Sequence, residues 1–366
     1  MILPMLFVLL CCGLVQSSNN TSSSSALSSA AFTHRQLTSS LAVTTLAGNG
    51  ATGANDGIGT SATFNMPHNL CFSTDESFVL IADFVNDRIR KYDMSTSEVT
   101  TVAGSSFGYE DNIGTLAKFY DPIDIKTHPS GDFALIADFS NNRIRQLTLA
   151  TGAVSTFVGN GIAIDANGIG TNASLHNPMG ISISSDGSFA VISSYSGHKI
   201  SKLVIATREL SFLAGSSSGY QNGVGSNAKF TCPYYLSLSP DNSYALIADY
   251  LNHVIRHLNV SSGEVSTYCG SATGNTVGSC DTQAQFYRPT DVAFAPDGSN
   301  AYVTDTYNHM IRRIDTSTKV MSTFSGTGSS GSANGALLSA KYNTPYGIAI
   351  NSDGTFAVDA ESAGNR

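Results

Sequence analysis

Short apolar runs alternate along the chain with clusters of turn-forming residues, and one unit shows the pattern clearly. Ile123 to Thr127 alternates in polarity, which predicts a strand with one buried face. Phe133 to Ala137 is continuously apolar, too short for a helix and bounded by turns, which predicts a strand buried on both faces. Arg143 to Leu147 and Val154 to Val158 complete the unit. The unit is therefore predicted to be a four-stranded antiparallel meander.

This unit recurs along the whole chain. Its closing string appears as TTLAG, TTVAG, STFVG, SFLAG, STYCG and STFSG, ending at Gly48, Gly104, Gly159, Gly215, Gly270 and Gly326. The intervals between these glycines are 56, 55, 56, 55 and 56 residues. A regular period of this length indicates an array of like units, each of which buries its apolar faces against its neighbours.

Four-stranded meanders repeated radially form a β-propeller, whereas linear arrays usually have shorter repeats. The chain begins with a lone fourth strand, Val43 to Ala47, and ends with strands one and two of a further unit, Gly347 to Ala360. We therefore predict an all-β fold over residues 41–366. It is a six-bladed β-propeller of four-stranded antiparallel blades, its sixth blade closed by the N-terminal strand and incomplete at the C-terminus. Because Arg366 precedes the expected third strand, we expect a fragment of a protein that continues.

Four stretches are similar to one another and carry a family resemblance: IADFVNDRIRKY, IADFSNNRIRQL, IADYLNHVIRHL and VTDTYNHMIRRI. With the preceding Pro-x-Gly-Ile and the closing V-x-T-x-A-G, they resemble the NHL repeat family of β-propellers over about residues 43–366. The resemblance implies a fold more than an activity. Propellers of this family include protein- and RNA-binding modules, the lyase of peptide amidation and relatives of lactonases.

The first residues are apolar and the next are polar, which predicts a secreted protein. Residues 1–18 are typical of a signal peptide, although no Lys or Arg precedes the apolar run. Residues 19–40 are rich in Ser, Thr and Asn and predict a disordered stalk. Sequons at Asn172 and Asn259 suit an extracellular glycoprotein or the ectodomain of a longer one. A net charge of −8 without a basic cluster argues against nucleic acid as a partner. No membrane span follows the leader, and we expect a monomer.

Four cysteines remain after the predicted leader, and none has the C-x-x-C spacing of a zinc site. Cys269 and Cys280 bracket one long loop and are predicted to form a disulfide. Cys71 falls in a predicted inner strand, as a small buried residue. The pairing of Cys71 and Cys232 is left open.

A set of polar residues, D-x-x-N-x-x-x-R, recurs in four units. It comprises Asp83, Asn86 and Arg90; Asp138, Asn141 and Arg145; Asp249, Asn252 and Arg256; and Asp305, Asn308 and Arg312. The third unit has Ser194, Gly197 and Ser201 at these places, so all three polar groups are replaced together. Concerted replacement predicts one local structural network, in which the aspartate pairs with the arginine across a hairpin.

The first strand of each unit begins after a proline and lies nearest the channel, so the next two residues should form its rim. The polar and aromatic residues there make a candidate ligand funnel: His68, Asn69, Asp124, Tyr234, Tyr235, Asp291 and Tyr346. The alternative is ordinary variation at a solvated channel mouth. The lyase resemblance requires several rim histidines, and only His68 has such a place, while His253 and His309 fall in turns. Asn69, Asp124 and Asp291 are the nearest set to a lactonase-like metal site, without the glutamate.

These observations favour a secreted, non-enzymatic propeller scaffold that binds a protein or glycan ligand and needs no cofactor. The alternative is a metal-dependent lyase or hydrolase, lactonase-like, that uses the central funnel. The chain has no nucleophile elbow, no H-E-x-x-H and no phosphate loop.

Overall fold

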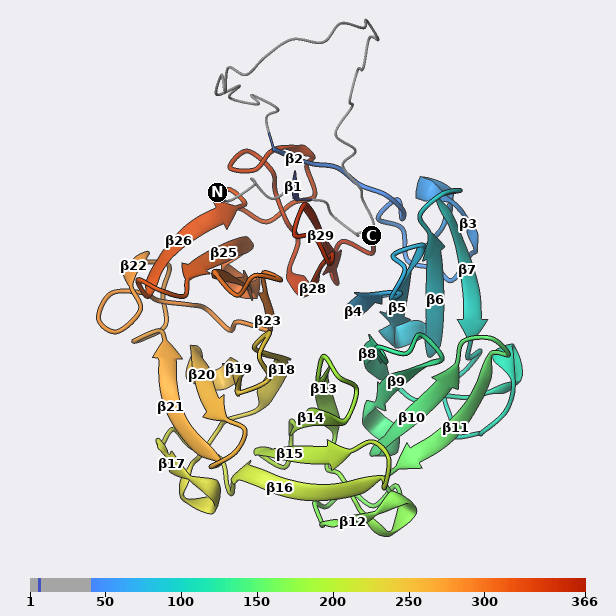
Figure 1. The fold of residues 1–366 in the computed structure, drawn as a ribbon. Helices are drawn as coiled ribbons and strands as arrows, with labels where there is room; N and C mark the ends of the chain where they lie inside the picture. Colours follow the sequence, from blue (N-terminus) through green and yellow to red (C-terminus); the bar gives the residue numbers. More distant parts are fainter. Residues whose placement is uncertain (1–5, 8–40) are drawn as a thin grey trace, which may run out of the picture.

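The structure is a computed structural model that describes residues 6–7 and 41–366. Antiparallel sheets stand around a central channel, each with its first strand toward the channel and its last strand outside (Figure 1). The fold is thus the all-β propeller that the repeats predict. Within the described residues, every helix is a single short 3₁₀ turn, and none is long and apolar enough to cross a membrane. Apart from residues 6–7, the predicted leader and stalk lie outside the described residues.

Five blades are complete, each with four consecutive strands in order from the channel outward. Blade 1 has β4 (Pro67–Phe72), β5 (Phe78–Asp83), β6 (Arg88–Asp93) and β7 (Glu98–Ala103). Blade 2 has β8 (Pro122–Thr127), β9 (Phe133–Asp138), β10 (Arg143–Thr148) and β11 (Ala153–Val158). Blade 3 has β13 (Pro178–Ile183), β14 (Phe189–Ser194), β15 (Lys199–Val204) and β16 (Glu209–Gly215). Blade 4 has β18 (Pro233–Leu238), β19 (Tyr244–Asp249), β20 (Val254–Asn259) and β21 (Glu264–Cys269). Blade 5 has β23 (Asp291–Phe294), β24 (Asn300–Asp305), β25 (Met310–Asp315) and β26 (Val320–Ser325).

Two-residue strands extend four of these blades at their outer edge: β3 (Gly57–Ile58), β12 (Gly168–Ile169), β17 (Gly223–Val224) and β22 (Gly278–Ser279).

The predicted sixth blade is not a blade in the structure, and the count of six is wrong. The sixth unit has β28 (Pro345–Ile350) and β29 (Phe356–Glu361) on the channel side. On the outer side, only β2 (Ala42–Val43) of the expected fourth strand is formed, and it pairs with β27 (Gly335–Ala336). The parallel neighbour of β29 is β1 (Leu6–Phe7), opposite Phe356 and Ala357. Because no described strand joins β29 to β2, the sheet is interrupted.

The second strand of each unit is buried on both faces, which explains its continuous apolar run. In β5, Leu80 and Ala82 pack toward blade 2, in one cluster with Ile125 and Ile136. Alternate residues of β5, such as Ile81, pack on the other face against the sixth unit. Full burial of one such aliphatic side chain contributes about 1.5–3 kcal/mol. Each blade therefore obtains much of its stability from its two neighbours.

The recurring polar set forms a buried ion pair in each of four blades. The aspartate–guanidinium distances are 2.8 Å for Asp83–Arg90, 2.7 Å for Asp138–Arg145, 2.9 Å for Asp249–Arg256 and 2.8 Å for Asp305–Arg312. The asparagine of each set donates to the same carboxylate, at 2.8 or 2.9 Å. The arginine also bonds the loop that precedes its blade; Arg145, for example, donates to the carbonyls of Lys118 and Glu110. The guanidinium thus holds that loop onto the blade.

Blade 3 replaces this network with a smaller one. The Ser194 hydroxyl donates to Asp165 of the loop at 2.8 Å, and the Lys199 ammonium lies 3.8 Å from the same carboxylate. Ser201 stands at the arginine position, and its buried hydroxyl has no hydrogen-bond partner among the described residues.

Replacing Arg145 by Met should destabilise the protein by about 3–5 kcal/mol, because Asp138 would remain buried without its counter-charge. The matched change in blade 3, Ser201→Ala, should leave stability within about 0.5 kcal/mol, since it removes a hydroxyl that makes no bond. Urea unfolding of both variants measures the difference. Equal effects of the two substitutions would contradict the structural role of the pair.

A second interaction joins each unit to the next. The residue before each first-strand proline has φ between 53° and 57°, and its N–H points to the preceding unit. The acceptor there is the side chain of a residue with left-handed backbone between the second and third strand positions, at 2.9–3.3 Å, and in blades 1, 2, 4 and 5 this residue follows a 3₁₀ turn. The donor–acceptor pairs are Asp121–Asp87, Asn177–Asn142, Cys232–His198, Arg288–His253, Thr344–His309 and Met66–Asn365. We call this contact the clasp. The last pair joins the sixth unit to blade 1 and so closes the ring.

Cys269, at the end of β21, and Cys280, just after β22, form a disulfide with a Cα–Cα distance of 4.2 Å. Cys71 and Cys232 are free thiols, both buried. The bridge fastens the loop that leads from blade 4 into blade 5.

Breaking this bridge with Cys269→Ser and Cys280→Ser together should lower the free energy of unfolding by about 2–3 kcal/mol in the chain-entropy treatment. Denaturant unfolding with and without a reducing agent tests this. The reducing agent should destabilise only the parent protein, and a similar effect on the double variant would contradict the assignment.

Candidate ligand site in the central channel

The predicted funnel residues converge on the channel axis but lie buried rather than at a solvated mouth. His68, Asn69, Asp124, Tyr234, Tyr235 and Asp291 are each at most 6% exposed, and Tyr346 is half-buried. The reason is that aromatic rings from several units meet at the axis. The His68 ring centroid lies 4.5 Å from that of Tyr346, and the Tyr234 centroid lies 6.0 Å from it.

Tyr235 spans the channel. Its hydroxyl donates to the carbonyl of Ile123 in blade 2 at 3.0 Å, and it lies 3.1 Å from Nδ1 of His68 in blade 1. Because the phenol has only one hydrogen, Nδ1 of His68 carries the proton of the second bond. These rings therefore form a floor across the channel at the level where the first strands begin.

Asp124 and Asp291 act as joints between units. Asp124 accepts from the N–H of Ile125 in its own strand at 2.8 Å and from Ile181 of blade 3 at 2.7 Å. Asp291 accepts from Val292 at 2.8 Å and from Ile348 of the sixth unit at 2.9 Å.

The unit that donates each of these inter-unit bonds has glycine at the aspartate position. A Cβ on Gly180 would lie 2.8 Å from Cα of Tyr235, and one on Gly347 would lie 2.6 Å from the His68 carbonyl oxygen. Only glycine permits these close approaches between adjacent first strands.

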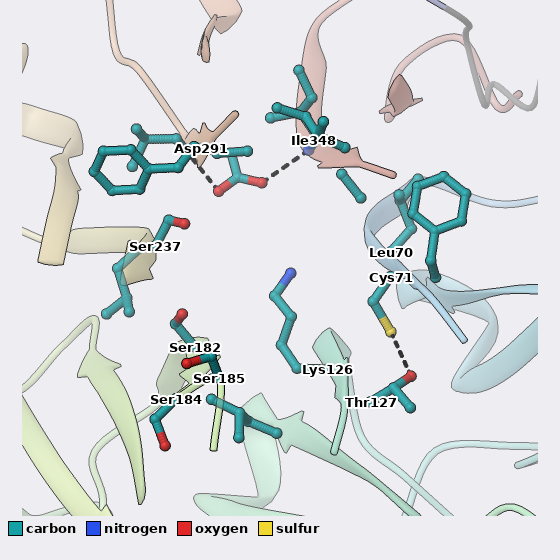
Figure 2. Close-up of a pocket in the computed structure, with 18 of the residues that line it drawn as sticks. Leu70, Cys71, Lys126, Thr127, Ser182, Ser184, Ser185, Ser237, Asp291 and Ile348 are labelled. Carbon is teal, nitrogen blue, oxygen red and sulfur yellow. Dashed lines mark hydrogen bonds between the residues drawn. The ribbon is translucent and has the colours of Figure 1, made fainter. Parts of the chain in front are cut away.

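Beyond the floor the channel widens into a cavity of about 330 Å³. Lys126 of β8 extends into its middle, with Asp291 on one wall and Ser182 and Ser237 on another (Figure 2). The Lys126 ammonium lies 3.2 Å from Oδ1 of Asp124. Apolar side chains, among them Phe72 and Phe294, complete the lining.

Sequence reasoning missed Lys126, although a signal was present. In a strand, residues two apart share a face, so the fourth residue after each proline faces the channel like the second. That position is occupied by Cys71, Lys126, Ser182, Ser237, Ala293 and Ala349. Only one of the six carries a charge.

The carboxylates and the ammonium fix the charge of the cavity. Burial raises the pKa of Asp291 to about 7, against the opposing effect of the Lys126 ammonium. Burial also raises the pKa of Asp124. For Lys126, burial lowers the pKa, but Asp124 and Asp291 raise it more, so the net pKa lies above its usual value. Lys126 therefore stays protonated, while Asp291 is partly protonated and partly ionised near neutral pH.

The pKa shifts in the cavity also bear on whether Lys126 or Cys71 could act as a nucleophile. A nucleophilic lysine needs a lowered pKa and a nucleophilic cysteine needs a thiolate. Lys126 has a raised pKa, and burial raises the pKa of the Cys71 thiol as well, whose sulfur lies 3.3 Å from the Thr127 hydroxyl. In the described part of the chain, no three His, Cys, Asp or Glu side chains are grouped so as to hold a metal ion. The cavity is equipped for hydrogen bonding and ion pairing.

The chain is similar to known proteins in both sequence and fold. No protein-family model matches the sequence. The chain is 30% identical over 240 residues to the chloroplastic protein SUPPRESSOR OF QUENCHING 1 of Arabidopsis thaliana, covering 61% of this chain and 22% of that protein. It is 26% identical over 303 residues to human NHL repeat-containing protein 2, covering 74% of this chain and 42% of the relative. The chain thus spans less than half the length of these curated relatives.

Among solved structures, an auxiliary nutrient binding protein from Bacteroides thetaiotaomicron superposes with a TM-score of 0.67 at 17% identity. The match covers 86% of this chain and 71% of that one, and at this identity it shows the fold alone. Fold, repeats and relatives together define the class as a β-propeller built from sequence repeats. The repeats are similar to those of NHL repeat-containing protein 2 of human, cow and chicken, which supports the NHL-repeat β-propeller that the sequence predicts.

Because His68 is buried in the floor, the free energy of unfolding should depend on pH in the acid range. Burial lowers the pKa of His68 from its usual 6.5 to about 3. The unfolded chain therefore takes up a proton below pH 6.5 that the native state refuses, and stability falls as the pH drops toward 3. At about 1.4 kcal/mol per pKa unit, this group alone should cost about 2–3 kcal/mol between pH 7 and pH 4.5.

The measurement is urea unfolding at both pH values for the parent and for His68→Gln, which cannot titrate. The loss between the two pH values should be smaller by that amount in the variant. An equal loss in both proteins would show that His68 is protonated in the floor.

Proposed function

We propose that this protein is a non-enzymatic binding scaffold and that its ligand occupies the channel cavity. The observation that supports this most is Lys126, a protonated side chain that extends into a cavity of about 330 Å³ among serine hydroxyls. Cavities of roughly 300–1,000 Å³ with a few convergent polar groups are typical of small-ligand sites. A nutrient-binding role described for a protein of similar fold is consistent with it.

The lining of the cavity favours the terminal sugar ring of a glycan as the ligand. Ser182 and Ser237 offer hydroxyl groups, and Asp291 accepts. Phe72 and Phe294 offer apolar faces beside these polar groups. A sugar ring presents hydroxyl edges and apolar faces in the same way, and Lys126 would bond a ring oxygen, a hydroxyl or a carboxylate.

We further propose that the protein works outside the cell. The Cys269–Cys280 disulfide supports this, since such bonds persist in oxidising compartments. The sequon residue Asn172 is exposed and accessible to glycosylation, whereas Asn259 is half-buried and its side-chain oxygen accepts bonds from Ser261 and Ser262.

The test is a calorimetric screen of neutral mono- to trisaccharides and uronic acids against the purified protein. A bound sugar should lose about tenfold or more in affinity on Lys126→Met, since a charge-assisted hydrogen bond is lost. The matched control is Arg313→Met, which removes an exposed cation of β25, outside the channel. Unchanged affinity in Lys126→Met, or no binding of any sugar in the set, would contradict the proposal.

A further inference from the structure

Three consecutive junctions of the ring are closed by a histidine. In these clasps, Nδ1 of an imidazole accepts the N–H of the residue that precedes the next first-strand proline. The distances are 3.1 Å for His198–Cys232, 3.0 Å for His253–Arg288 and 3.3 Å for His309–Thr344. They join blade 3 to blade 4, blade 4 to blade 5, and blade 5 to the sixth unit, which follow one another around the ring (Figure 1). One half of the ring is therefore closed by imidazoles.

An imidazole can serve as the acceptor of a clasp only while it is neutral. The neutral ring carries one hydrogen, so Nδ1 accepts when that hydrogen is on Nε2. Protonation adds a hydrogen to Nδ1, and two donors then face each other across 3.0–3.3 Å. The bond is lost, and the backbone N–H has to find another acceptor.

The other three clasps keep their acceptor in acid. Asn142 and Asn365 accept through amide oxygens, which do not titrate. Asp87 accepts the N–H of Asp121 at 3.0 Å, and a protonated carboxyl group still has an oxygen that can accept. Acid therefore removes the acceptor from the histidine clasps alone.

The three imidazoles are half-buried, so protons from solvent can reach them, but the closed clasp disfavours the charged form. Burial lowers the pKa of His198, His253 and His309. When a clasp opens, its imidazole returns toward the ordinary pKa and binds a proton more readily. Falling pH therefore favours the open form of each histidine clasp.

The charged neighbours act in the same direction at two of the clasps. The guanidinium of Arg288 lowers the pKa of His253 further. The imidazole of His176 lowers the pKa of His198, and the carboxylate of Asp165 opposes it. The ammonium of Lys199 lies 3.8 Å from that carboxylate and weakens its influence.

The clasps hold the starts of the strands that line the channel. Cys232 lies directly before the proline of β18, and Tyr235 of the channel floor follows three residues later. The N–H of Tyr235 donates to the carbonyl of Thr290 at 3.1 Å, and Thr290 lies two residues after Arg288. Two adjacent histidine clasps therefore hold the two ends of a bond that joins blades 4 and 5 at the floor.

We propose that the three histidine clasps form an acid-sensitive latch. Protonation of the imidazoles releases the starts of the channel-lining strands of blades 4 and 5 and of the sixth unit, while the other three junctions hold. The channel floor then loosens on that half of the ring, and the bond from Tyr235 to Thr290 loosens with it.

Amide hydrogen exchange followed by NMR at pH 7.5 and pH 5 tests the latch, with each rate expressed as a protection factor so that the intrinsic effect of pH is removed. Protection at Cys232, Arg288 and Thr344 should fall about tenfold or more in acid. Protection at Tyr235 should fall with them, although its carbonyl acceptor does not titrate. Asn177, whose clasp has Asn142 as acceptor, should keep its protection. An equal fall at Asn177, or no fall at the histidine clasps, would overturn the proposal.

The matched variant replaces His198, His253 and His309 together by Asn, the acceptor of two other clasps and a residue that tolerates a positive φ. It should keep its protection at pH 5, and a loss as large as in the parent would contradict the latch. The converse variant, Asn142→His, should transfer acid sensitivity to Asn177, and continued protection there would also contradict it. The converse variant and the comparison of amides within the parent keep the test valid where the triple variant fails to fold.

Discussion

The buried guanidinium is the interaction on which the order of this propeller depends. Removing a guanidinium and a carboxylate from water is costly, and the cost is offset only when the remaining donors and acceptors find partners. In blade 1, Arg90 bonds Asp83 and three residues of the preceding loop, and Asp83 in turn accepts from the N–H of Asn65 at 2.8 Å. Asn65 lies two residues before the proline that begins β4. The ion pair therefore fixes where a channel-lining strand begins, and the geometry of the channel follows from charges buried further out.

Within the channel, one strand face serves two purposes. In blades 2 and 5, the second residue after the proline makes a joint, where the carboxylates of Asp124 and Asp291 bridge to units that carry glycine. The fourth residue makes no carboxylate joint to the next unit, so a lysine or a serine can occupy that position and face the cavity. Structural and chemical roles are thus separated by two residues of one strand, about 7 Å along the channel.

The sequence was sufficient where a periodic pattern determines the structure. The order of four strands in each unit follows from alternation and turns, because both faces of strand two must be buried. The blade count could not be obtained this way, since it depends on whether strands distant in sequence meet across the sixth unit. The buried floor was also out of reach, because it arises where rings such as Tyr235 and His68 from opposite blades fill the same space. The clasp roles of His253 and His309 depend on a left-handed backbone that the neighbouring residues impose.

The closure between the sixth unit and blade 1 has a dynamic consequence. It depends on the clasp from Met66 to Asn365, the close approach of Gly347 to β4 and the packing of Val358 and Ala360 beside Ile81. Both junctions of the sixth unit, with blade 5 and with blade 1, join a complete sheet to the β28–β29 hairpin, whereas the other junctions join two complete sheets. Separation here exposes less apolar surface than global unfolding does, so it forms a sub-global opening of lower free energy. β28 and β29 therefore form a cooperative unit that can detach from the ring while the five blades keep their native packing.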